Sequence, residues 1–319
     1  MKALVLGARG AVGRAVVAEL GRTGETAVPA GRTRPDGGVA IDLSSGDGLS
    51  ALHRVAADVD VVVNASGVER PELAARVGAT PLVEISATGR YLERLGRRAT
   101  GDGAGVLLGA GLVPGLSTIM ASATADRPGD AIDVMVMLGS GEAHGAAAVE
   151  WTSRLLGTTI HAAPEAGPVR NLRSWRRAPV TGGRVRRHLR ADFPDHVLIG
   201  RARQQEIRTY LALSSPVATA ALAAVAHVPR LRGILARAPH LGSSRWHLST
   251  TNRRTGRTLR ATGEGQSHAT GVLAALAARR MAADPPTMPV TMDRVISWPE
   301  ALDLLAPRGN DTGNDLVID

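Results

Sequence analysis

Three glycines near the N-terminus have the spacing of a loop that holds a dinucleotide phosphate. Gly7, Gly10 and Gly13 form the pattern G-x-x-G-x-x-G between an apolar run and a helical pattern. Gly7 would permit a tight turn, Gly10 would let the backbone approach a pyrophosphate, and Gly13 would allow close helix packing. The pyrophosphate would rest on the N-terminus of a helix that starts with Ala11 and Val12, where N–H groups favour anions. The alternative is a purely structural turn.

Two arginines and a threonine follow the second apolar run, where an NAD-binding site usually has an acidic residue. The segment reads Gly31-Arg32-Thr33-Arg34. An acid at this place binds the ribose 2′-hydroxyl of NAD(H), whereas guanidinium groups pair with a 2′-phosphate. Arg9 of the glycine loop could join the same site. The sequence therefore predicts NADP(H) as the cofactor, and the alternative is an exposed basic turn in an arginine-rich chain.

Further cofactor contacts are expected where other apolar runs end, because ligands of parallel sheets bind beyond the carboxyl ends of the strands. One pair of residues could flank the adenine, a turn of small residues could let the cofactor pass closely, and a strand-to-helix turn could meet the nicotinamide carboxamide. These are, in that order, Asp42 and Leu43, then Asn64, Ala65, Ser66 and Gly67, then Val113 and Pro114. The last turn could equally be a simple strand-to-helix connection.

Candidates for a proton donor are few. Lys2 is the only lysine, so the chain has no Tyr-x-x-x-Lys pair. Glu84 ends a buried run, where desolvation could poise its carboxyl group for proton transfer, although it could also cap a turn. His144 lies in a glycine-rich stretch and could act as a general acid, or could simply be solvated. The histidine spacing predicts no metal site.

Composition excludes some classes of chemistry and partner. The 319 residues include no cysteine, which rules out disulfides and zinc–cysteine sites. Residues 1–168 carry 15 basic and 18 acidic side chains, and residues 169–319 carry 23 and 11. The basic half could meet an anion, although a general preference for arginine explains it too. Aromatic residues make up only 2% of the chain, so stacking on nucleobases is not expected.

Apolar runs and helical patterns alternate over the first 125 residues, which predicts βαβ units and a parallel, doubly wound sheet. The apolar runs are Ala3–Leu6, Ala27–Ala30, Val39–Ile41, Val59–Asn64, Leu82–Ile85 and Val106–Leu108. Beyond residue 126 the pattern changes to strands buried on one face, with two hairpins. These hairpins are expected at Val180–Leu189 and around the turn between Trp246–Thr251 and Arg257–Ala261. The predicted fold class is α/β, a Rossmann domain with an inserted α+β domain whose sheet is largely antiparallel.

Several segments resemble the saccharopine dehydrogenase-like NADP-binding oxidoreductases and, more loosely, the carboxynorspermidine dehydrogenases. The glycine loop matches their cofactor fingerprint. Leu82–Ala87 is similar to their fifth-strand motif, in which Asp usually stands at the position of Glu84. Gly109–Ser117 is similar to their Gly-x-x-Pro-Gly-x-Ser turn, with Leu112 at a position that is commonly aromatic. Weaker similarities cover Leu138–Gly145 with Trp151-Thr152, and Gly263–Gln266.

The resemblance implies an organisation and an activity. Residues 1–125 would form the NADP-binding domain, to which residues 266–306 return, and residues 126–265 would form a substrate and dimerisation domain before a flexible tail at 307–319. The reaction would transfer hydride between NADP(H) and a C–N bond of a small molecule that carries an amine or a carboxylate. A homodimer is expected.

Two other functions stay open from the residues alone. One is a non-catalytic NADP(H)-binding regulator or scaffold, which would share the glycine loop and the arginines. The other is a nucleic-acid binder, which the scarcity of aromatic residues disfavours. The most apolar later stretch, Leu211–Val228, contains polar residues and reads as a buried helix, so no membrane partner is expected. The predicted location is the cytoplasm.

Overall fold

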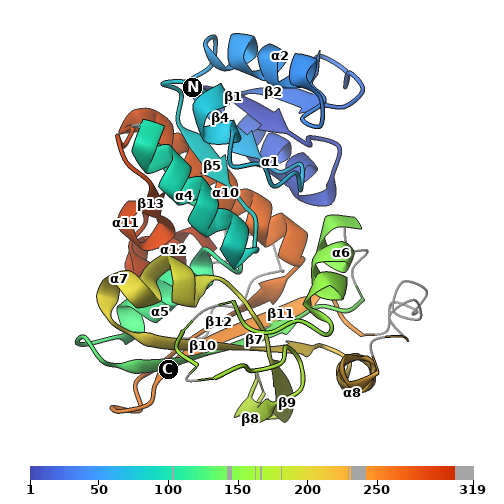
Figure 1. Ribbon diagram of the computed structural model, residues 1–319, viewed down its shortest axis with the longest axis vertical. Coiled ribbons are helices and arrows are strands. Elements are labelled where there is room, and N and C mark those ends of the chain that lie inside the picture. Colours follow the sequence, from blue (N-terminus) through green and yellow to red (C-terminus); the bar gives the residue numbers. More distant parts are fainter. Residues whose placement is uncertain are drawn as a thin grey trace. The chain divides into compact units, whose positions relative to one another are not determined.

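The computed structural model describes residues 1–102, 104–141, 146–161, 163–165, 167–180, 182–228, 230 and 242–305 (Figure 1). His144 and the predicted tail at 307–319 lie outside the described residues. The chain forms two compact units. The first comprises Met1–Leu116 and Ser267–Ser297, and the second comprises Ser117–Gln266 together with the helix at Trp298–Leu305. The segments Leu116–Thr124 and Trp298–Leu305, which the predicted bounds place with the first domain, thus group mainly with the second unit.

The first unit is built on a seven-stranded parallel sheet in the order β13-β6-β5-β4-β1-β2-β3. The strands are β1 Lys2–Leu6, β2 Thr26–Gly31, β3 Val39–Ala40, β4 Val61–Asn64, β5 Leu82–Glu84, β6 Val106–Leu108 and β13 Val290–Thr291. Because β1 lies between β2 and β4, the strand order reverses beside it, and ligands of open parallel sheets bind at such a point. This sheet confirms the doubly wound fold, although the sequence did not predict β13.

Within its described residues the first unit has six helices: α1 Ala11–Arg22, α2 Gly46–Ala56, α3 Leu73–Arg76, α4 Gly89–Asp102, α10 Gln266–Ala283 and α11 Met292–Val295. Helix α10 packs closely on α1 through small residues. A Cβ atom added to Gly271 would lie 2.3 Å from the Cβ of Ala15, so the two helices touch almost backbone to backbone. The later part of the chain thereby supports the helix that follows the glycine loop.

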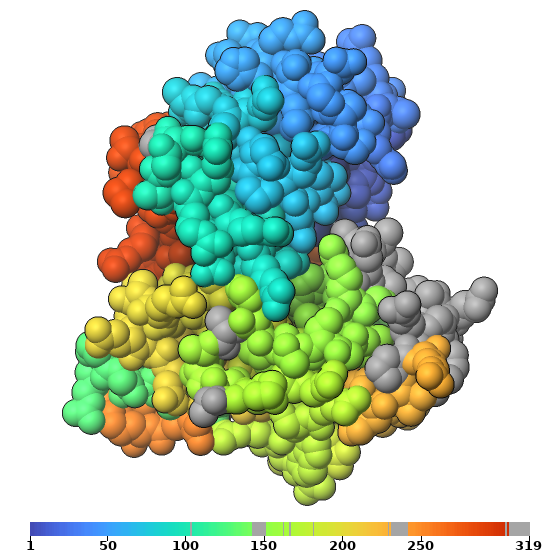
Figure 2. Space-filling view, in the orientation of Figure 1, coloured from blue at the N-terminus to red at the C-terminus, as the bar shows by residue number. Residues whose placement is uncertain are grey.

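The second unit contains a six-stranded sheet in the order β12-β11-β7-β10-β9-β8. Its strands are β7 Ala131–Leu138, β8 Trp175–Pro179, β9 Val185–Arg190, β10 Glu206–Leu213, β11 Arg245–Asn252 and β12 Thr258–Glu264. Only β7 and β10 pair in parallel, so the predicted, largely antiparallel sheet is confirmed. Both predicted hairpins are present as β8–β9 and β11–β12, although β8 lies before the predicted start at Val180. The β8–β9 hairpin protrudes from this unit, in yellow-green at the bottom of Figure 2.

Helices of the second unit are α5 Leu116–Thr124, α6 Ala146–Leu155, η1 His196–Gly200, α7 Arg201–Arg203, α8 Pro216–His227 and α12 Trp298–Leu305. The π-helix η1 runs directly into α7. The stretch Leu211–Val228 is not one buried helix, because its first residues complete β10 before Ser215 caps α8. Leu211 is a buried residue of β10. Pro216 suits the first turn of the helix that follows.

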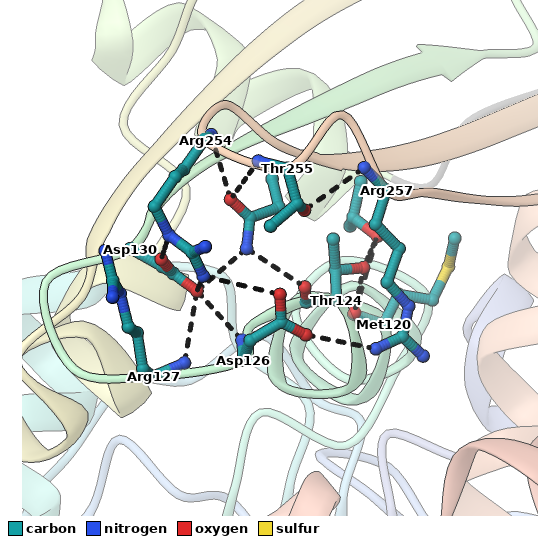
Figure 3. A network of polar contacts seen from close by, with 10 residues as sticks. Met120, Thr124, Asp126, Arg127, Asp130, Arg254, Thr255 and Arg257 are labelled. Carbon is teal, nitrogen blue, oxygen red and sulfur yellow. Dashed lines mark hydrogen bonds and ion pairs between the residues drawn. The ribbon is translucent and has the colours of Figure 1, made fainter.

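A buried carboxylate ties the start of β7 to the β11–β12 hairpin (Figure 3). Asp130 is only 2% exposed, and its Oδ1 accepts a hydrogen bond from Arg254 Nε at 2.7 Å. Its Oδ2 accepts from Asn252 Nδ2 at 2.8 Å and from the backbone N–H groups of Asp126 and Arg127. The guanidinium of Arg254 and these donors hold the pKa of Asp130 well below its usual range.

We expect Asp130→Ala to lower the melting temperature of the second unit by several degrees, because it leaves Asn252 and two backbone amides without their acceptor. Asp126→Ala is the matched control. Its carboxylate is partly exposed and contacts Arg254 and Arg257 at 3.4 Å, so the loss should be much smaller. Equal losses in differential scanning calorimetry would contradict this account.

Candidate dinucleotide-binding site

The glycine loop is held between two neighbouring segments of the first sheet. Gly7 has a φ of +77°, which a residue with a side chain rarely adopts. The N–H groups of Gly7 and Ala8 donate to the carbonyl of Ala30 in β2, at 2.9 and 3.1 Å. A Cβ atom added to Gly7 would lie 2.5 Å from the Cα of Ser66, in the turn after β4. Only glycine fits at this position.

The other two glycines differ in their surroundings. A Cβ atom on Gly13 would lie 2.2 Å from the carbonyl oxygen of Gly7, so α1 approaches the loop too closely for any side chain. A Cβ atom on Gly10 would meet only that same oxygen, at 3.2 Å. The outer side of the loop is therefore open at Gly10, where the predicted pyrophosphate would approach.

The N-terminus of α1 is suited to an anion. Within the described residues, no side chain caps its first turn and no acidic residue lies there. Helix α2 differs, because Ser45 accepts a hydrogen bond from the N–H of Gly48 at 3.0 Å and Asp47 lies in the first turn. Polar groups at a helix N-terminus need an acceptor, and at α1 the phosphates of a dinucleotide would supply it. The residues present thus fit the predicted group.

The basic turn after β2 places its residues in different roles. The guanidinium of Arg9 donates to the hydroxyl of Thr33, so the structure brings these two predicted residues together across the loop. Arg34 donates from Nε to the carbonyl of Gly38 at 2.8 Å and holds its own turn. Arg32 is exposed. The predicted residues therefore differ in role: Arg9 and Thr33 are hydrogen-bonded to each other, Arg32 is exposed, and Arg34 holds its own turn.

Asp42 and Leu43 follow β3. Hydrogen bonds from the hydroxyl and N–H of Ser44, and to a lesser degree the charge of Arg32, lower the pKa of Asp42. Leu43 is buried, and its carbonyl accepts a hydrogen bond from Arg70 at 3.0 Å.

The turn after β4 is organised by Asn64. Its Nδ2 donates to the carbonyl of Val68 at 3.1 Å and to Oε2 of Glu84 at 2.7 Å. Its Oδ1 accepts from the hydroxyl of Ser66 at 2.6 Å. The small residues Ala65 to Gly67 thus form a turn fixed from inside the unit, and Gly67 has a φ of +75°.

The carboxylate of Glu84 lies at the end of β5 and is 2% exposed. Its Oε2 also accepts from the hydroxyl of Tyr91 at 2.8 Å, and its Oε1 accepts from the N–H of Ser86 at 2.9 Å. Burial, with a smaller contribution from the charge of Glu69, raises the pKa of Glu84 to about 7 against the opposing effect of its hydrogen-bond donors. The sequence singled out Glu84 but missed Tyr91, since nothing in the spacing indicates that α4 turns this hydroxyl back to β5.

The turn after β6 contains the predicted nicotinamide contacts. Gly111 N–H donates to the carbonyl of Pro114 at 2.9 Å, and a Cβ atom on Gly115 would lie 1.9 Å from the carbonyl oxygen of Gly111. Pro114 is buried and Val113 is half-buried. The N–H of Leu112 meets Thr270 Oγ1 at 3.4 Å, so α10 supports the turn.

Among the described residues, no group of three or more His, Asp or Glu side chains could hold a metal ion. No helix among them combines the length and the apolar character needed to cross a membrane.

The chain matches no protein-family model and no curated protein sequence. Among solved structures it is similar to a mutant of meso-dapdh with DAP from Clostridium tetani E88, with 11% identity, a TM-score of 0.48 and 97% of each chain covered. It is also similar to the WlbA (WbpB) dehydrogenase from Thermus thermophilus in complex with NAD and UDP-GlcNAcA, with 12% identity, a TM-score of 0.39, and coverage of 98% of this chain and 97% of that one. At these low values the likeness carries no argument about activity, cofactor or substrate.

We expect Gly13→Ala to destabilise the first unit by about 1–3 kcal/mol, because its methyl group would overlap the carbonyl of Gly7. Gly21→Ala in the same helix is the matched control. No atom outside the helix lies within 4 Å of its added Cβ, so it should be neutral or stabilise by up to ~1 kcal/mol. Denaturant unfolding of both variants measures the difference, and a loss of similar size in Gly21→Ala would refute the close approach.

Glu84 should make stability depend on pH. The pKa of the folded carboxyl is raised above its unfolded value of 4.5, so its contribution to stability is complete below pH 4.5 and is lost as the pH rises through about 7. The loss amounts to at most ~3 kcal/mol. Glu84→Gln removes the titrating group, so the stability of the variant relative to the wild type should improve between pH 5 and about pH 8.

Thermal unfolding at a series of pH values checks this expectation. Glu72→Gln serves as the control for removal of a carboxylate, because the side chain of Glu72 is 58% exposed. A stability difference between Glu84→Gln and the wild type that does not change with pH would contradict the assignment.

Proposed function

We propose that the protein is an NADP(H)-dependent oxidoreductase of the saccharopine dehydrogenase-like type, which reduces an imine or a related unsaturated small molecule. The observation that carries the proposal is the glycine loop, whose open side at Gly10 meets the uncapped N-terminus of α1. The joined pair of Arg9 and Thr33, with Arg32 exposed nearby, supports a 2′-phosphate ligand. NADP(H), when bound, supplies or accepts the hydride.

The chain's own residues would bind and orient the cofactor. The N–H groups of α1 would hold the pyrophosphate, and Arg32 would pair with the 2′-phosphate. Asn64 to Gly67 and Val113 with Pro114 would line the path toward the nicotinamide. His144 and Glu84 are the proposed proton donors, and the basic side chains of the second half would suit a substrate carboxylate.

A non-catalytic NADP(H)-binding regulator is the second candidate. The observation that favours it is the engagement of Glu84, since both its oxygens already accept hydrogen bonds within the first unit. NADPH oxidation with a panel of imines, or of α-keto acids with amines, separates the two candidates. Turnover supports the enzyme, and NADPH binding without turnover of any panel member supports the regulator.

A homodimer is also proposed. Strand β8 is an edge of its sheet, and the hairpin exposes Trp175 by 47% and Val185 by 61%. Exposed edges and large apolar side chains are commonly covered by a second copy. Light scattering at micromolar concentration measures this state. The cytoplasmic location and the lack of nucleic-acid or membrane partners stay predictions.

Arg32→Ala should weaken NADPH binding about 10- to 150-fold while NADH binding changes little, because only NADPH offers a 2′-phosphate to the guanidinium. Isothermal titration calorimetry with both cofactors measures the ratio. Arg54→Ala, an exposed arginine of α2, controls for the loss of a positive charge from the same unit. An equal loss of affinity for both cofactors would overturn the preference for NADP(H).

A further inference from the structure

One row of residues crosses the first sheet where four of its strands end. Leu6 pairs with Asn64, Asn64 pairs with Glu84, and Glu84 pairs with Leu108. These are the last residues of β1, β4, β5 and β6. The loops that follow them leave the same edge of the sheet, since the strands are parallel. Glu84 therefore stands between the turn after β4 and the turn after β6.

The side chain of Glu84 fixes the amide of Asn64. The carbonyl of Val68, one acceptor of Asn64 Nδ2, never carries a hydrogen, and the carboxyl group of Glu84, the other acceptor, carries none when it is ionised. The amide can satisfy them in only one orientation, which turns Oδ1 toward Ser66. The N–H of Ser66 reaches the same oxygen at 3.3 Å. Glu84 thereby determines which way Asn64 holds the turn.

This turn lies directly against the glycine loop. The Cα of Ser66 and the carbonyl of Ala65 would be 2.5 and 2.6 Å from a Cβ atom on Gly7, so the two backbones are in contact. Because these backbones are close-packed, a shift of the turn at 64–67 must also move the glycine loop. The path from Glu84 to Gly7 thus has two intermediate residues, Asn64 and Ser66.

The backbone of Glu84 holds a second loop. Its carbonyl accepts hydrogen bonds from the N–H groups of Gly109 and Ala110, at 2.9 and 2.8 Å. These residues begin the turn that contains Val113 and Pro114. The same residue therefore anchors two of the turns proposed to contact the cofactor, while its carboxylate oxygens are bonded within its own unit.

We infer that Glu84 is a positioning residue for the dinucleotide site, which acts through Asn64 on the turn at 64–67 and thereby on the glycine loop. The inference rests on the proposed function, because it takes these turns to be cofactor contacts. It gives Glu84 a role different from that of the proton donor predicted by the sequence.

Two variants test the path. Glu84→Gln replaces one acceptor oxygen by an NH2 group, which then faces one of the groups that donate to Glu84. Asn64→Ala removes the side chain that accepts from Ser66. Each should weaken NADPH binding about tenfold. Each should also accelerate hydrogen–deuterium exchange of residues 64–68 in the cofactor-free protein. The double variant should bind NADPH no more weakly than Asn64→Ala alone, because the two residues act in series.

Two control variants separate positioning from general destabilisation. Tyr91→Phe removes the donor from α4 but keeps the contact between Glu84 and Asn64, so it should lower the melting temperature and leave NADPH affinity within about twofold. Val62 lies in β4 and is buried like Asn64. Val62→Ala therefore measures how much NADPH affinity falls when core packing alone is lost. The losses in Glu84→Gln and Asn64→Ala must exceed the loss in Val62→Ala.

The possible outcomes are distinct. Unchanged affinity and exchange in Glu84→Gln and Asn64→Ala would overturn the inference. A fall in kcat on an imine that the wild type reduces, with NADPH affinity intact, would overturn it in favour of proton donation. A wild type that binds neither NADPH nor NADH would refute the proposed function. The exchange of residues 64–68 would then still decide whether Glu84 holds the turn.

Discussion

The contact between Gly7 and the turn after β4 is the constraint on which the first unit depends. The backbone of Ser66 occupies the space where a side chain at residue 7 would be, and Gly13 then brings α1 against the same loop. Hydrogen bonds from Gly7 and Ala8 to the carbonyl of Ala30 join the glycine loop to β2. The loop is therefore in contact with β2, the turn after β4 and α1, and it is exposed at Arg9 and Gly10. An opening lined by backbone N–H groups is chemically selective for an anion.

Each unit contains a buried carboxylate, and the pKa values of these two groups are shifted in opposite directions. Asp130 meets the guanidinium of Arg254, which stabilises its charge and lowers its pKa. The donors on the carboxylate of Glu84 are an amide, a hydroxyl and a backbone N–H, so burial dominates and its pKa is raised. Asp130 connects segments more than 120 positions apart, and Glu84 connects β5 to the turn after β4 and to α4. The difference in pKa follows from the strong desolvation of Glu84 and from the guanidinium that bonds to Asp130.

The basic turn after β2 illustrates how a composition that favours arginine can obscure a site. Arg32 and Arg34 stand two positions apart and look equivalent in the sequence. In the structure both are exposed, but Arg34 donates to the carbonyl of Gly38 and stabilises its own turn, and Arg9 joins Thr33 from another loop. A preference for NADP(H) would therefore rest on Arg9 and Arg32 more than on Arg34.

The sequence by itself predicted most of the strands and helices, because alternating apolar runs and helical patterns are local signals. It also located the glycine loop, the two hairpins of the second sheet and the acid at the end of β5. It could not determine that β13 joins the first sheet, since two residues make too short a pattern. Nor could it predict that Tyr91 and Asn64 share the carboxylate of Glu84, or that Asp130 meets Arg254 across 124 positions. Only the tertiary structure decided these contacts, because they join residues from different elements whose meeting depends on how the sheets pair and the loops return.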